Sequence, residues 1–237
     1  MMKMKHIMTP SVISVTPETP IPEVARLLLE RHISAVPVID TNGELRGIVS
    51  EGDLLRRTED GSHPHGSWWL RHFSKRGASA ADYVKARGRF AADVMTPGVV
   101  TVTEDSLSSE VAHLLETQRI KRVPVMREDK VVGIVSRADL IRGLAAGKDM
   151  ASPSVSVADE TIREQLLKEL EQADWAPSYG ISVIVADGTV RIWGLVDSQD
   201  QVDALRVAAE NVPGVKGLEL NVESMPPYAW GAYGWVA

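Results

Sequence analysis

The alternation of apolar and polar positions over residues 7–57 predicts three strands and two helices. Residues 12–15, 36–39 and 45–49 are short apolar, β-branched runs of the kind typical of strands. The last two runs are joined by Thr41-Asn42-Gly43, and an Asn-Gly pair between apolar runs favours a hairpin turn. We therefore expect these two runs to pair as antiparallel neighbours.

Helical spacing accounts for the rest of this segment. Val24, Leu27 and Leu28 fall on one face of a helix. Thr19 is its expected cap, since threonine is a common N-cap residue. The first turn of this helix tolerates the prolines at positions 20 and 22. Ser50 is expected to open a last helix that runs through residue 55. The predicted order is strand, helix, strand, strand, helix.

The same pattern occurs twice in the first 150 residues. Chance does not produce so many matches in the same order, so the segment holds two copies of one unit. Since a unit of about 50 residues buries too little apolar surface to be comfortable alone, the copies are expected to share a core. The matching segments are Met8-Thr9-Pro10 with Met95-Thr96-Pro97, Val36-Pro37-Val38 with Val123-Pro124-Val125, and Gly47-Ile48-Val49-Ser50 with Gly133-Ile134-Val135-Ser136.

The M-T-P start, the V-P-V in the middle and the closing G-I-V-S-x-x-D-L resemble the CBS (cystathionine β-synthase) domain, here in tandem as a Bateman module. The resemblance covers residues 7–57 and 93–144. It implies an α+β fold in which two β-α-β-β-α repeats pack as a pseudo-twofold pair. It also implies clefts between the copies, which in this family often bind adenosine nucleotides.

Ser50-x-x-Asp53 and Ser136-x-x-Asp139 each follow a predicted strand and open a predicted helix. One interpretation is a capping box, which satisfies free helix N–H groups and needs no ligand. The other adds a ligand, because a helix N-terminus suits phosphate and a nearby carboxylate can accept both hydroxyls of a ribose. The assignment of the aspartates to ribose rests mainly on the resemblance.

The two copies differ in charge where the resemblance implies contact with phosphate. The first copy has Ser34-Ala35 and Glu51, whereas the second has Lys121-Arg122 and Arg137. Arg and Lys are the residue types that bind phosphate. We therefore expect the Asp139 site to take the phosphorylated ligand and the Asp53 site to be empty or to take a less charged adenosine compound. The alternative is that these cations are solvated surface charge.

The resemblance also places the adenine base on the apolar surface of the V-P-V strand, held by backbone groups of residues 14–16 or 101–103. The predicted nucleotide-binding residues are Thr101, Thr103, Lys121, Arg122, Pro124, Ser136, Arg137 and Asp139 in the second repeat, and Ser14, Thr16, Ser34, Ala35, Pro37, Ser50 and Asp53 in the first.

An insert separates the repeats and carries six Lys/Arg against one acid over residues 62–91. Trp68, Trp69 and Phe73 favour packing or an interface, and a lipid or nucleic-acid contact is the alternative. A metal site at His63, His65 and His72 is not expected, because no carboxylate lies at ligand spacing. The expected organisation is repeat 1 at 1–57, a helical insert at 58–92, repeat 2 at 93–147, a linker at 148–154, a third domain at 155–224 and an aromatic tail at 225–237.

The third domain is predicted to have the order α-β-β-α-β. Asp159 is its expected first cap, and Asp187-Gly188 joins two strands as a hairpin. Asp187-Gly188-x-Val190, Gly194-x-Val196 and Val212-Pro213-Gly214-Val215 resemble the BON domain, and Gly194 and Gly214 are expected in turns. That family is proposed to bind phospholipid or to attach proteins to partners. Five basic against thirteen acidic residues over 153–237 make contact with anionic lipid doubtful here.

The chain has 237 residues, a net charge of −6 and no cysteine, which excludes disulfides, thiolate metal sites and a cysteine nucleophile. No apolar signal segment is present near the N-terminus, so a cytoplasmic protein is expected. Walker, G-x-S-x-G, H-E-x-x-H and G-x-G-x-x-G motifs are missing, so catalysis is not expected.

The resulting prediction is a non-catalytic sensor of AMP, ADP or ATP, with S-adenosylmethionine or NAD as alternative ligands and no metal. We expect a homodimer formed through the CBS pair and an unknown protein partner for the BON domain. Membrane contact is a weaker alternative, and nucleic acid is not expected as a partner. The competing interpretation is a ligand-free dimerisation scaffold or a membrane-associated adaptor.

Overall fold

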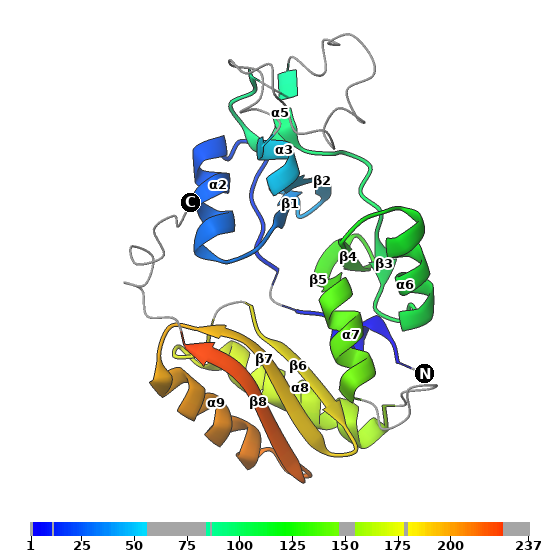
Figure 1. Ribbon diagram of the computed structural model, residues 1–237, viewed down its shortest axis with the longest axis vertical. Coiled ribbons are helices and arrows are strands. Elements are labelled where there is room, and N and C mark those ends of the chain that lie inside the picture. The colour runs from blue at the N-terminus through cyan, green and yellow to red at the C-terminus, as the bar shows by residue number, and fades with distance from the viewer. Residues whose placement is uncertain are drawn as a thin grey trace, which may run out of the picture. The chain divides into compact units, whose positions relative to one another are not determined.

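The computed structural model describes residues 2–10, 12–55, 84–85, 87–146, 155–177 and 180–224 (Figure 1). Contacts divide the chain into two compact units. The first-repeat unit comprises Ile13–Val100 and Glu128–Val131, and the second-repeat unit comprises Met1–Val12, Thr101–Arg127 and Val132–Ala237. The expectations for the linker, the aromatic tail and the aromatic and histidine-containing part of the insert lie outside the described residues.

The first-repeat unit contains an antiparallel pair of strands with helices packed on it. The hairpin turn is as predicted: Asp40 Oδ1 accepts the N–H groups of Asn42 (2.9 Å) and Glu44 (3.0 Å), and Gly43 adopts a φ of +82°. The helices and strands are α2 (Ile21–Glu30), β1 (Ala35–Ile39), β2 (Leu45–Ser50), α3 (Glu51–Leu55) and α5 (Ala91–Val94).

The predicted cap of α2 is wrong. The helix begins at Ile21 with Pro20 as its N-cap, and no side chain caps it. A cap at Thr19 would need N–H groups in the first turn, but Pro20 and Pro22 have none. The Thr19 hydroxyl instead accepts the backbone N–H of Thr16 (3.0 Å), which closes the loop before the helix.

The predicted strand over residues 12–15 is reduced to one bridge. Val15 pairs in parallel with Val38, and its N–H donates to the carbonyl of Pro37 (3.0 Å). The apolar run is nevertheless in the expected place, because Val15 is buried in the core of this unit.

The second-repeat unit contains the second copy of the repeat. Its three-stranded sheet has the order β3-β4-β5, and β3 runs parallel to β4. The elements are α1 (Met4–Ile7), β3 (Val102–Thr103), α6 (Ser108–Thr117), β4 (Arg122–Arg127), β5 (Lys130–Ser136) and α7 (Arg137–Ala146).

The M-T-P segment that begins each repeat in the sequence pairs with the closing strand of the other repeat. In the second-repeat unit, Thr9 and Ile134 exchange two backbone hydrogen bonds of 3.0 Å each. In the first-repeat unit, Thr96 and Ile48 exchange bonds of 2.8 and 3.1 Å. The compact units therefore do not coincide with the repeats read along the chain.

Two glycines make this exchange of segments sterically feasible. A Cβ at Gly133 would lie 2.5 Å from the sulfur of Met8, and one at Gly47 would lie 2.6 Å from the sulfur of Met95. A side chain at either position would force the methionine to move, so the glycine of each G-I-V-S segment suits a strand on which a methionine packs closely.

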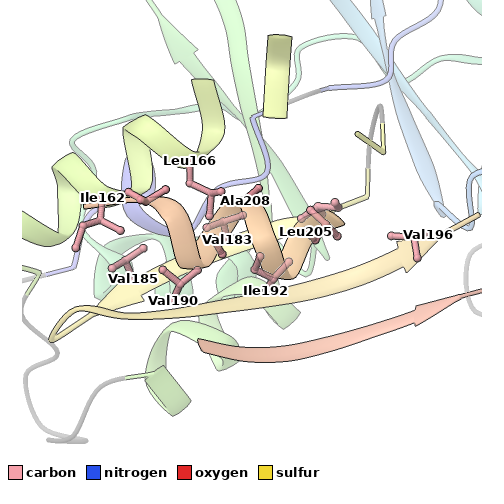
Figure 2. Packing of buried hydrophobic residues seen from close by; sticks show 12 residues of the cluster. Ile162, Leu166, Val183, Val185, Val190, Ile192, Val196, Leu205 and Ala208 are labelled. Carbon is pink, nitrogen blue, oxygen red and sulfur yellow. The ribbon is translucent and has the colours of Figure 1, made fainter. Parts of the chain in front are cut away.

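The C-terminal part of the second-repeat unit has the predicted order α-β-β-α-β. β6 and β7 are antiparallel, and β7 and β8 are parallel with α9 as the crossover. Both helices pack on the same apolar face of the sheet (Figure 2). The elements are α8 (Val157–Gln172), β6 (Ser182–Ala186), β7 (Thr189–Val196), α9 (Gln199–Asn211) and β8 (Gly217–Ser224).

Two expectations for this part need correction. Ser156, not Asp159, is the N-cap of α8, and Asp159 completes the capping box while its other oxygen accepts the N–H of Gly188 (2.7 Å). Gly194 does not lie in a turn but inside β7. A Cβ at this position would collide with the carbonyl oxygen of Gly180. Gly214 does lie in a turn, with a φ of +94°.

The second face of this sheet is also covered. Along β6, Val183 and Val185 point to α8 and α9, whereas Ile184 packs with the core of the second repeat. The strand is accordingly buried along its whole length, and α1 and α7 both contact it. The β6–β7 pair therefore packs on α8 and α9 with one face and on the core of the second repeat with the other, which the sequence analysis did not predict.

Candidate functional site

The Ser136–Asp139 pair lies where β5 ends and α7 begins. Asp139 is buried, and its Oδ2 accepts the backbone N–H of Ser136 (2.8 Å) and the Ser136 hydroxyl (2.7 Å). In return the N–H of Asp139 points to the Ser136 hydroxyl oxygen at 3.4 Å. The capping interpretation of this motif is therefore correct, and it uses only one of the two carboxylate oxygens.

The second carboxylate oxygen faces a cation. Asp139 Oδ1 accepts a hydrogen bond from Arg142 Nη1 at 2.9 Å, and the pair is spaced three residues apart on α7. The same guanidinium lies over the indole of Trp193 in β7, with 6.0 Å between the guanidinium carbon and the ring centroid. Sequence reasoning missed this contact, although the repeat itself matches Arg142 with Arg56 of the first copy.

The first repeat builds the same capping geometry. Asp53 is buried, and its Oδ2 accepts the N–H (2.9 Å) and the hydroxyl (2.6 Å) of Ser50. Among the described residues no side chain pairs with the other oxygen of Asp53, and Arg56 lies outside them. The two sites therefore share the same hydrogen bonds between a serine and an aspartate.

The two repeats have an equivalent backbone hydrogen bond between residues that differ in charge. The N–H of Arg137 donates to the carbonyl of Lys121 (3.1 Å), and in the first repeat the N–H of Glu51 donates to the carbonyl of Ser34 (3.0 Å). The pairs occupy matching places beside Asp139 and Asp53. The second repeat thus brings two cations together where the first has one anion and a neutral residue.

The cations of the second repeat are accessible. Lys121 and Arg137 are both exposed, and one Arg137 nitrogen donates to the carbonyl of Leu115 (3.1 Å). Lys121 has no side-chain partner within the described ranges, and Arg122 is half-buried at the start of β4. Long, exposed side chains of this type can turn toward a phosphate group without breaking a buried ion pair.

The remaining predicted residues lie on β-strands or in the loops beside them. Pro37 and Pro124 are buried in β1 and β4, and Ala35 is buried at the start of β1. The exposed hydroxyls of Thr16 and Thr103 take part in local bonds, to Thr19 (3.2 Å) and Ser106 (3.1 Å) respectively. Ser14, Thr101 and half-buried Ser34 lie beside these segments in their own repeats.

A separate cavity of about 1030 Å³ lies in the second-repeat unit between α1, α8 and the loops around β3 and β4. None of the predicted nucleotide-binding residues lines it. Two of its walls are joined by buried His6, whose Nε2 lies 2.6 Å from Glu160 Oε1 and whose Nδ1 accepts the N–H of Lys3 (3.0 Å). Burial lowers the pKa of His6, and the hydrogen bond from His6 lowers the pKa of Glu160.

Arg163 joins the same two parts of the unit from inside. Its Nε donates to the carbonyl of Val183 (2.9 Å) in β6, and its Nη2 donates to the carbonyl of Met8 (2.8 Å). Burial lowers the pKa of Arg163 to about 10, so the side chain stays protonated at neutral pH. The role of these bonds is to attach the M-T-P segment to the α-β-β-α-β part.

Metal and membrane features were sought over the same residues. Among the described residues, no three His, Cys, Asp or Glu side chains gather as metal ligands would. Within the described ranges, every helix falls short of the length and apolar character that a bilayer crossing requires.

Comparison with known proteins identifies both parts of the chain. The profile of the CBS domain matches residues 4–60 and 91–146, and that of the BON domain matches residues 158–223. The CBS domain-containing protein CBSX1, chloroplastic, of Arabidopsis thaliana is 33% identical over 137 residues, which are 54% of this chain and 57% of that protein. This chain thus spans a little over half the length of CBSX1.

Two further relatives are covered almost completely. The uncharacterized protein MJ1426 of Methanocaldococcus jannaschii is 30% identical over 154 residues, which are 60% of this chain and 91% of that protein. The crystal structure of CBSX2, an Arabidopsis thaliana protein, in complex with AMP superposes with a TM-score of 0.52 and 28% identity, covering 62% of this chain and 99% of that one.

Proposed function

Because the chain belongs to the CBS-domain family and carries a BON domain after its two CBS repeats, we propose that it is a non-catalytic regulatory protein that binds an adenosine nucleotide in its second repeat. The observation that carries the proposal is the buried Asp139 at the start of α7 with two exposed cations, Lys121 and Arg137, beside it. The AMP complex of CBSX2 supports AMP as the first ligand to test.

Each chemical part of AMP has a partner of the right type in this repeat. The Asp139 carboxylate accepts the two ribose hydroxyls, since each of its oxygens has more than one lone pair. Lys121 and Arg137 face the phosphate, and the positive end of the α7 helix dipole adds to the attraction. The buried β4 strand around Pro124 supplies apolar surface for the base. ADP, ATP, S-adenosylmethionine and NAD contain the same adenosine and are the alternative ligands.

The first repeat has the same aspartate but repels phosphate. Glu51 occupies the place of Arg137, and Ser34 and Ala35 occupy the places of Lys121 and Arg122. A carboxylate near a phosphate costs binding free energy, and Ser34 and Ala35 carry no charge that would offset it. The Asp53 site is therefore proposed to stay empty or to hold an adenosine compound without phosphate.

Calorimetric titration of the full chain with AMP and with adenosine tests the assignment. Asp139→Asn should weaken AMP about 10- to 100-fold, because it removes a charge-assisted hydrogen-bond acceptor worth about 1.5–3 kcal/mol. Asp53→Asn is the matched control and should leave AMP affinity unchanged. Replacing Lys121 and Arg137 together by Ala should remove the preference for AMP over adenosine.

Two results would contradict the proposal. The first is AMP affinity that is equal in wild-type protein and in correctly folded Asp139→Asn. The second is the absence of any heat with AMP, ADP, ATP, S-adenosylmethionine and NAD, which would favour the ligand-free scaffold. Thermal melts provide an independent check, since a ligand at 100 times its Kd stabilises the folded state by about 2.7 kcal/mol.

Assembly through the CBS repeats is a further part of the proposal. Ile141 and Leu144 of α7 are 65% and 49% exposed, and Leu55, the equivalent of Ile141 in the first repeat, is 60% exposed. Apolar residues exposed at equivalent helix positions support a symmetric partner, which a second copy of the chain supplies. Light scattering on wild-type protein and on Ile141→Lys distinguishes a dimer that the charge disrupts from a monomer that it leaves unchanged.

The BON domain is proposed to pass the ligand signal to a protein partner. Support comes from its direct packing on the repeat that carries Asp139. Its acidic composition, thirteen Asp and Glu against five Lys and Arg over residues 153–237, favours a protein partner over anionic lipid. Flotation with vesicles containing phosphatidylglycerol tests this choice, because binding to them would favour the adaptor alternative.

A further inference from the structure

We propose that Arg142 couples the state of the Asp139 carboxylate to the BON domain. Arg142 contacts both sides of this connection: its Nη1 is 2.9 Å from Asp139 Oδ1, and its guanidinium lies 6.0 Å from the ring centroid of Trp193 in β7. One residue therefore joins the predicted ribose acceptor to a strand of the BON sheet. The inference rests on the proposed function only for the identity of the ligand.

Trp193 is well placed to report on the second repeat. In the β6–β7 pair, Trp193 is opposite Ser182 and Arg191 is opposite Ile184, so these residues share the sheet face that turns away from α8 and α9. Ile184 and Trp193 both pack with the core of the second repeat. Their strand neighbours Val183 and Ile192 belong to the core of the BON domain itself. A shift of Trp193 thus acts on the BON sheet directly.

The far end of α7 is attached to the same strand. Arg191 Nη1 donates to the carbonyl of Ala146 (3.2 Å), and the Arg191 side chain is held by two bonds of 2.9 Å to Glu219 of β8. α7 is therefore fixed to β5 at its start through Ser136 and to the BON sheet at its end. Because both ends of α7 are held, a change in the hydrogen bonds of Asp139 acts on Arg142, which lies between the two ends.

Competition for one oxygen explains how a ligand changes this contact. Asp139 Oδ2 already accepts two hydrogen bonds from Ser136, and Oδ1 accepts its bond from Arg142. A ribose diol that donates to Oδ1 weakens the attraction between the carboxylate and the guanidinium. Arg142, which is one-third exposed, then rearranges relative to the face of Trp193. The matched residue of the first repeat, Arg56, lies outside the described residues, so the route is proposed for the second repeat.

A double-mutant cycle on the ligand-free full chain tests the connection itself. The chain has six tryptophans, so Trp193 emission is obtained as the difference between each variant and the same variant carrying Trp193→Phe. Asp139→Asn should change Trp193 emission, and the matched Asp53→Asn should not. In an Arg142→Gln background the effect of Asp139→Asn should fall at least about fivefold, because coupled residues are not additive. An effect of equal size with and without Arg142 overturns the proposal.

Titration with AMP then separates this proposal from the proposed function. Wild-type protein should show a saturable change in Trp193 emission, and Arg142→Gln should lose it while calorimetry still detects AMP. Because Arg142 and the ribose compete for Asp139 Oδ1, Arg142→Gln should also change the Kd of AMP by about fivefold, the low end of typical couplings. If Arg142→Gln binds AMP and still shows the Trp193 response, the proposed role of Arg142 is refuted and the nucleotide proposal stands. An absence of binding to AMP and to the four alternative adenosine compounds refutes the nucleotide proposal, and the ligand-free cycle still decides whether Arg142 connects Asp139 to Trp193.

Discussion

Replacing Ile184 by Ala tests whether the second repeat and the BON domain form one folded unit. Ile184 is fully buried, and its side chain packs with Met4, Ile7 and other residues of the second-repeat core instead of the BON core. Three lost carbon atoms at about 0.8 kcal/mol each give about 2.4 kcal/mol. The cavity left behind raises the total into the usual range of about 2–5 kcal/mol for this substitution. For a chain of this length the midpoint of thermal unfolding should fall by roughly 5–15 °C.

The control is the neighbouring residue on the opposite face of the same strand. Val185 is also buried, but it packs with α8 and α9. Hydrogen exchange followed by mass spectrometry should show faster exchange in α7 for Ile184→Ala, whereas Val185→Ala should act first on α8 and α9. If Ile184→Ala leaves α7 fully protected, or costs less than about 0.5 kcal/mol, β6 does not pack on the core of the second repeat as described.

Two further variants test individual contacts. Burial lowers the pKa of His6 in the folded state, so the unfolded chain binds the His6 proton first as the pH falls. The free energy of unfolding should therefore decrease below pH 6.5, the pKa of His6 in the unfolded chain, by at most about 1.4 kcal/mol per pH unit. The lowered pKa of Glu160 extends the loss below pH 4.5, and denaturant midpoints across this range should become flatter in His6→Gln. Gly194→Ala should destabilise the chain by about 1–3 kcal/mol, because its Cβ would collide with the Gly180 carbonyl. Gly217→Ala, whose Cβ meets Thr189 at an ordinary 3.4 Å, is the control in urea titrations, and equal costs for the two variants would refute the steric argument.

The sequence predicts the local elements well because its signals are local. The Asn42-Gly43 turn and the order of elements in the BON domain are confirmed, since turn chemistry and apolar spacing act within a few residues. The predicted cap of α2 was wrong for a reason that was also local: Pro20 and Pro22 have no N–H groups for Thr19 to bind. Gly194 was misjudged because the close approach of Gly180 comes from a segment that no spacing rule connects to it.

The candidate site divides in the same way between local and distant contacts. Ser136-x-x-Asp139 was identified because a capping box is a pattern of four adjacent residues. The contact of Arg142 with Trp193 joins residues 51 positions apart, and it depends on which face of β7 turns toward α7. One signal of that contact was present in the sequence. Residues 181–186 are nearly all apolar, and a strand of a half-exposed sheet would alternate with polar residues.

The exchange of M-T-P segments determines how the second site has to be studied. A fragment that starts at the second repeat, near residue 93, would lose the Thr9–Ile134 bonds that extend β5. It would also lose the Met8 side chain over Gly133 and the Met8 carbonyl that buried Arg163 binds, which leaves a buried charge without one of its two acceptors. β5 leads directly into the Ser136–Asp139 junction, so weak binding by such a fragment would reflect the loss of residues 2–10 and not the affinity of the site. The ligand site, the exchanged segment and the BON domain therefore have to be measured together in the full chain.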